Sequence, residues 1–141
     1  NGGNEYKLIW DSVIHDDPNY FSFTPGENII SVLRPGVYEI ISNVVLDNSQ
    51  DSTYSDGYCT INLTKNDEEL EYTTAVITNP ATANQPFNSA KIHTIIDLVE
   101  DLSTADKLSV RLYNSPTSAG QQIVPAQSDI LIRWLGLKPT F

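Results

Sequence analysis

The stretch IISVLRPGVYEIISNVVL, residues 29–46, decides the fold of this chain. Pro35 and Gly36 are the residue types that make a tight turn, and the residues after them alternate between apolar and polar side chains. One face of the alternating segment carries Tyr38, Ile40, Val44 and Leu46. A period of two residues is typical of a strand with one buried face, so the stretch predicts a turn followed by a strand against a core.

The same period recurs on both sides of this stretch. Further strands are predicted at residues 8–14, 29–33, 59–63, 70–77, 90–98, 108–112 and 129–137. Segments rich in Gly, Pro, Asn, Asp and Ser separate them, as expected for turns. Residues 95–102 also fit helical spacing, but β-branched residues precede them and favour a strand that leads into a turn. The pattern predicts an all-β, jelly-roll β-sandwich of about eight to ten antiparallel strands.

Length and charge limit the classes of function. With 141 residues the chain is expected to form a single domain, residues 1–141, whose core needs no disulfide or metal. Eight Lys and Arg face eighteen Asp and Glu, for a net charge of −10, which argues against binding nucleic acid or an anionic membrane. No apolar run is long enough to insert into a membrane. The chain starts at Asn1 and lacks methionine, so we interpret it as a fragment of a longer fibrous or stalked protein.

The residues that usually carry catalysis are few. Cys59, the single cysteine, lies in an alternating run and is expected to be a buried structural thiol. His15 and His93 are the only histidines, and His93 is expected on the strand face opposite Ile92. No Gly-x-Ser-x-Gly motif and no zinc-ligand spacing occur. We therefore expect no catalytic residues and a protein that is not an enzyme.

Two long polar loops, residues 48–56 and 79–88, are the places where a β-sandwich would carry a binding function. The candidate ligand-binding residues in these loops are Asp51, Tyr54, Asp56 and Asn84. Calcium prefers oxygen ligands, and Asp47, Asp51 and Asp56 surround the first loop, although their spacing does not match an EF-hand. No cofactor is expected, with calcium at these three carboxylates as the alternative.

The turn and strand of residues 29–40 resemble the globular head of complement C1q and the related tumour necrosis factor superfamily. The resemblance rests on Pro35-Gly36-Val37-Tyr38 and the apolar alternation that follows. Similar segments follow along residues 8–137, at residues 10–21, 59–66, 98–112 and 128–136. Ala105-Asp106 replaces the Gly-Asp that is usual in the family. The phrases at residues 10–17 and 132–136 look like C1q-like heads in phage and other virion fibre proteins.

The resemblance implies a homotrimer of three identical chains at the end of a fibre or stalk, on a virion surface or otherwise extracellular. Such a head is expected to attach to a host-surface receptor or glycan, with avidity from three weak contacts. Aromatic side chains suit subunit contacts, and our candidates are Tyr6, Tyr113, Trp134 and Phe141. Three alternatives stay open. They are a purely structural trimerisation or capsid-decoration domain, a secreted C1q-like partner-binding head, and a carbohydrate-binding module.

Overall fold

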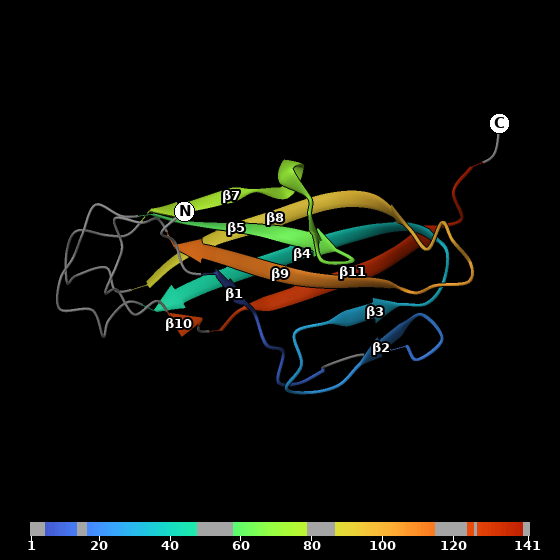
Figure 1. The fold of residues 1–141 in the computed structure, drawn as a ribbon, viewed down its shortest axis with the longest axis horizontal. Helices are drawn as coiled ribbons and strands as arrows, with labels where there is room; N and C mark the ends of the chain where they lie inside the picture. The colour runs from blue at the N-terminus through green and yellow to red at the C-terminus, as the bar shows by residue number, and fades with distance from the viewer. Residues whose placement is uncertain are drawn as a thin grey trace.

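The computed structural model describes residues 5–13, 17–47, 58–78, 87–114, 124–125 and 127–139. Within these ranges the chain forms eleven β-strands and a single short 3-10 helix, η1 (Glu71–Thr73). The strands belong to two antiparallel sheets, and the long ones run along the long axis of the molecule in Figure 1. The predicted all-β sandwich is confirmed.

The larger sheet has seven strands, with β9 and β5 side by side at its centre. The strand order is β2 (Phe21–Phe23), β3 (Ile30–Val32), β9 (Asp106–Asn114), β5 (Tyr58–Lys65) and β6 (Glu68–Glu69). Two further strands of this sheet pair with the central strands. β1 (Glu5–Lys7) pairs with β9, and β7 (Ala75–Thr78) pairs with β5. In Figure 1, β2 and β3 lie at one margin of the molecule.

The smaller sheet has four strands and is organised around β4 (Gly36–Asp47). β8 (Phe87–Leu98) pairs with β4 along all twelve of its residues. On the other side of β4 lie β11 (Asp129–Gly136) and the two-residue β10 (Val124–Pro125), which follow one another along the same edge. The turn at Arg34, Pro35 and Gly36 leads directly into β4, as the sequence predicted.

The core fills the space between the two sheets. Fully buried side chains come from alternate positions of five strands and include Val32, Tyr38, Ile40, Val44, Ile61, Leu63, Leu108 and Val110. Each such apolar side chain contributes about 2 kcal/mol of burial free energy. The one polar group among these side chains has a hydrogen-bond partner, since the Tyr38 hydroxyl donates to the Arg34 carbonyl oxygen at 2.6 Å. Burial is the main reason why the pKa of Tyr38 rises to about 12.

Two predicted strands differ from the observed ones. The strand expected at residues 8–14 is wrong for residues 8–13, and the strand β1 lies upstream of it. The cause is a contact with a distant turn, because the Trp10 amide donates to the Glu27 carbonyl and the Gly26 amide donates to the Trp10 carbonyl. These bonds tie the segment to the turn before β3. The strand expected at 70–77 is split, since the Thr73 hydroxyl bonds to the backbone of residues 63 and 70 and stabilises η1 before β7 begins.

Three pairs of neighbouring strands nest inside one another along the sequence. β5 pairs with β7, β4 pairs with β8, and β3 pairs with β9. The pairing pattern is therefore that of one long hairpin, in which the paired strands are divided between the two sheets. This nesting brings segments far apart in sequence, such as residues 30–32 and 106–108, into direct pairing.

Candidate functional site

The outward faces of the two sheets differ in chemistry. The outward face of the seven-stranded sheet is polar and carries Thr60, Asn62, Thr64, Ser109 and Arg111. The outward face of the four-stranded sheet carries six aliphatic side chains, namely Val37, Ile41, Val45, Ile95, Leu131 and Leu135, and we call it the aliphatic face. Ile95, Leu131 and Leu135 are 60%, 52% and 46% exposed. An exposed apolar patch on a sheet is typical of a surface that meets another protein.

A charged cluster lies in the middle of the aliphatic face. Glu39 of β4 accepts hydrogen bonds from His93 of β8, with 2.9 Å between Nε2 and Oε2, and from Arg133 of β11. The hydrogen bond to His93, opposed by partial desolvation and aided by Arg133, lowers the pKa of Glu39 below its usual value. The carboxylate is therefore ionised and paired, and it adds directional contacts to a face that also carries polar side chains at Asn43, Lys91, Asp97 and Asp129.

A groove of about 750 Å³ opens between β2 and β11, where the two sheets diverge at one edge. β11 is paired on one side only, since β4 is the only strand of the described residues that pairs with it. Its inward-facing residues are therefore only partly buried, and they are Ile130, Ile132 and Trp134. Aromatic side chains dominate the rest of the wall, namely Trp10, Tyr20, Phe21 and Phe23. The polar groups in the lining are Ser12, Asp17, Ser128, Asp129 and Arg133. A concave, mostly apolar surface with a few polar groups is the usual form of a small-ligand site.

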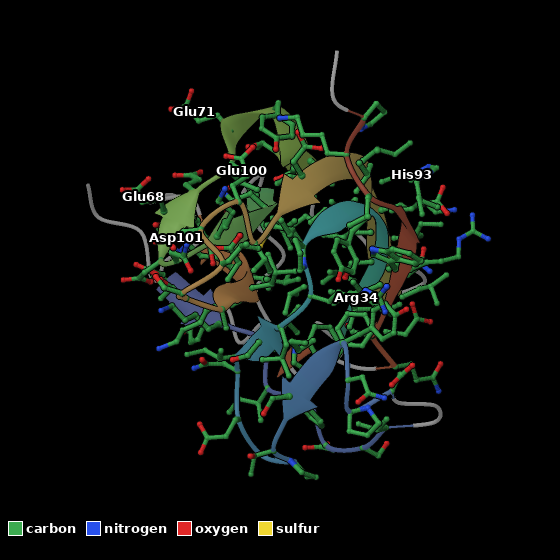
Figure 2. The ribbon with its side chains drawn as sticks, turned by 90° about the vertical axis from the view of Figure 1, so that its right-hand side faces the viewer. Arg34, Glu68, Glu71, His93, Glu100 and Asp101 are labelled. Atoms are coloured by element: carbon green, nitrogen blue, oxygen red, sulfur yellow. The ribbon has the colours of Figure 1, made fainter. Side chains whose placement is uncertain are left out.

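Arg34 lies beside this groove, in contact with two of its lining residues, Tyr20 and Trp134. Its guanidinium carbon lies 4.8 Å from the centre of the Tyr20 ring and 4.5 Å from that of Trp134. The two rings meet edge to face, 5.5 Å apart, so the guanidinium lies in the corner between them. Nη1 of Arg34 donates to the Tyr20 hydroxyl at 2.8 Å, and the Trp134 indole donates to the Pro35 carbonyl at 3.2 Å. Figure 2 shows Arg34 in the same half of the view as His93, away from Glu68, Glu71 and Asp101.

The predicted subunit-contact residues are not gathered on one surface. Tyr6 lies on β1 and is exposed, while Tyr113 lies on the outward side of β9, where its hydroxyl accepts a hydrogen bond from Arg111. Trp134 lies on the inward side of β11, in the groove. Phe141 lies outside the described residues. A shared role for these residues in subunit contacts stays a prediction.

The predicted ligand-binding residues of the two loops lie outside the described part of the chain. Asp51, Tyr54, Asp56 and Asn84 lie outside the described residues, and of Asp47 only the backbone, at the end of β4, is described. Calcium at Asp47, Asp51 and Asp56 therefore stays a prediction. Among the residues that the structure does describe, no three His, Cys, Asp or Glu side chains are grouped so that they could hold a metal ion.

The aliphatic face and the Arg34 corner are the features that sequence reasoning missed. A signal for the first was present, since β11 alternates Ile130, Ile132 and Trp134 with Leu131 and Leu135, and so is apolar on both faces. A strand that is apolar on both faces is typical of burial on both sides. The sequence contains no signal for the Arg34 corner, because only the fold brings Tyr20, Arg34 and Trp134 together.

The expected burial of Cys59 is confirmed, and it allows a direct chemical test. Cys59 lies in β5, is fully buried, and its pKa is raised to about 11 by desolvation. Only the thiolate is nucleophilic, so we expect native protein at pH 8 to resist alkylation by iodoacetamide and unfolded protein in urea to react at the rate of a free cysteine. Mass spectrometry measures both rates. Equal rates in the two states would show that the thiol is accessible.

No protein-family model and no curated protein matches this chain. Over the described ranges, no helix has the length and apolar character that crossing a membrane requires.

Proposed function

We propose that this chain is a non-enzymatic, homotrimeric binding head at the end of a fibre or stalk, most simply a virion or phage fibre that attaches to a host receptor or glycan. The observation that carries the proposal is the aliphatic face of the four-stranded sheet. Three exposed, branched side chains lie on the two strands that flank β4, Ile95 on β8 and Leu131 and Leu135 on β11, and covering them with another apolar surface lowers the free energy.

The partner proposed for this face is two further copies of the same chain. The number three comes from the resemblance of residues 29–40 to C1q-like heads, which are trimers around a threefold axis. The nested strand pairs support the finer assignment of a jelly roll, the fold of those heads. Closed cyclic symmetry buries the same patch on every subunit, and it leaves the distal loops available for a ligand.

The assembly is tested by placing a charge on the aliphatic face. We expect the unmodified protein to elute with three times the 15.6 kDa mass of one chain, and Leu131→Glu to elute as a folded monomer, because a buried unpaired carboxylate costs several kcal/mol. Size-exclusion chromatography with light scattering measures both masses. The control is Leu102→Glu, at an exposed turn position away from this face, which should remain trimeric. An unmodified protein that is monomeric at micromolar concentration would sink the proposal.

Ligand binding by the assembled protein is a separate question from assembly. A glycan array and a host-cell binding assay, both performed with the trimer, should give specific positive signals. If both remain blank while the protein is trimeric, the purely structural role of trimerisation or capsid decoration replaces the binding role. If the protein is monomeric and binds polysaccharide, the aromatic groove favours a carbohydrate-binding module instead.

A further inference from the structure

Within the described part of this strongly acidic protein, Arg34 is a cation without an acidic partner. The chain has a net charge of −10 and contains three arginines. Arg111 is paired with Glu5 and Asp67, and Arg133 is paired with Glu39. Among the residues that the structure describes, Arg34 alone of the three has no carboxylate within ion-pair distance. Its contacts are the rings of Tyr20 and Trp134 and the Tyr20 hydroxyl.

These contacts fix the position of the guanidinium but leave donors unused. Nη1 is engaged with the Tyr20 hydroxyl at 2.8 Å, whereas Nε and Nη2 have no hydrogen-bond partner among the described residues. Nε and Nη2 form the edge of a guanidinium that binds a carboxylate through two parallel hydrogen bonds. Since the two rings already restrict the side chain, less rotamer entropy is lost when an anion binds than for a free arginine.

The groove beside Arg34 suits a ligand that is apolar on one side and rich in hydroxyls on the other. Tyr20 and Trp134 contact Arg34 and also line the groove, so a ligand that extends along these rings can reach the cation beside them. Hydrogen-bonding side chains lie along the walls at Ser12, Ser128 and Asp17. The Asp17 carboxylate accepts hydrogen bonds from the backbone and side-chain amides of Asn19 through one oxygen, and its second oxygen can accept from a hydroxyl group.

We propose that this groove binds a sugar that carries a carboxylate, with the carboxylate on the Nε and Nη2 edge of Arg34. The sugar ring lies against the aromatic wall, and its hydroxyls bond to Ser12, Ser128 and Asp17. A neutral sugar leaves the Arg34 edge without a partner, and a simple carboxylate leaves the aromatic wall empty. The inference names the ligand class of the binding role proposed above and rests on that role.

The two tryptophans of the chain make the test direct. Trp10 and Trp134 are the only tryptophans, and both line the groove, so intrinsic fluorescence reports on its occupancy. The probes are N-acetylneuraminic acid and galacturonic acid, with galactose and acetate as the neutral and the simple-carboxylate comparisons. We expect a saturable change with at least one of the two acids, with a dissociation constant of about 1 mM, and at least tenfold weaker binding of galactose and acetate.

Variants of Arg34 separate ligand recognition from a structural role. Arg34→Gln should weaken binding of the sugar acid roughly tenfold or more, because a charge-assisted pair is lost. The affinity of Arg34→Lys should lie between those of the unmodified protein and Arg34→Gln. The control is Lys107→Gln, an exposed cation on the other sheet with the same change of charge, which should bind as the unmodified protein does. Thermal unfolding of each variant identifies any that fail to fold, in which case Arg34→Lys carries the comparison.

Three results would overturn the inference: no saturable change with either acid, equal affinity for galactose or acetate, or equal binding by folded Arg34→Gln and Lys107→Gln. Light scattering on the same samples keeps this result separate from the assembly. Binding by a monomer would support the Arg34 site while refuting the trimer. A trimer that binds neither acid would refute the Arg34 site and leave the assembly standing.

Discussion

Gly36→Ala is expected to lower the free energy of unfolding by about 3 kcal/mol or more, the largest effect of any single methyl group added to this chain. A Cβ at this position would lie 2.2 Å from the Trp134 indole nitrogen and 2.6 Å from the Gly136 carbonyl oxygen. Both neighbours are held, since Trp134 packs between Tyr20 and Arg34 and the Gly136 carbonyl belongs to the backbone of β11. The backbone φ of +152° at Gly36 adds strain for any residue with a side chain.

Gly26→Ala is the matched control for this substitution. Gly26 also has a positive φ, +90°, but a Cβ there would meet nothing within 4 Å. The control therefore carries only the backbone strain, about 1 kcal/mol, and the difference between the two variants measures the clash with Trp134. Urea unfolding followed by far-UV circular dichroism gives both values. Equal losses in the two variants would show that the turn before β4 is not packed against Trp134.

Ile61→Ala is expected to cost about 3 to 4 kcal/mol, because it leaves a cavity in the centre of the core. Ile61 lies in the middle of β5 and is 0% exposed, between Ala75 of β7 and Leu112 of β9 in the register of the sheet. β5 is hydrogen-bonded on both sides, to β7 and to β9, so its backbone can relax only partly into the space. The unfolding temperature should fall by about 10 °C or more.

Ile9→Ala makes the same chemical change at a position that is 58% exposed, and should cost less than about 0.5 kcal/mol. Calorimetry on both variants gives the comparison. A loss at Ile61 no larger than that at Ile9 would mean that the two sheets do not enclose this side chain.

The period of two residues was sufficient to predict the strands that have one buried face. β4, β5, β8, β9 and β11 all lie at the predicted positions, because in each of them alternate side chains must leave water together. The segment of residues 8–13 shows the limit of the rule. It is rich in apolar residues, as a strand would be, yet its backbone bonds to the turn at Gly26 and Glu27, a contact that the local sequence does not predict.

The candidate site could be predicted only in part for a related reason. Apolar residues on both faces of β11 are the sequence signal for the aliphatic face, on which Leu131 and Leu135 are exposed. The Arg34 corner depends on three residues that are separated by fourteen or more positions, and their meeting is set by the pairing of whole strands. Sequence distance contains no information about such a contact, so aromatic residues were assigned to subunit contacts by type alone.

The nested strand pairs also set an order of assembly for the chain itself. Of the three nested pairs, β5 and β7 are the closest in sequence, so their pairing closes the shortest loop of the three and loses the least chain entropy. Once they are joined, β4 and β8 are separated by a much shorter effective loop, and β3 and β9 follow in the same way. We therefore expect the strands in the middle of the chain to pair first and the strands nearer its ends to pair later. Its slow, non-local folding leaves the terminal strand β11, and with it the aliphatic face, incomplete until the last step.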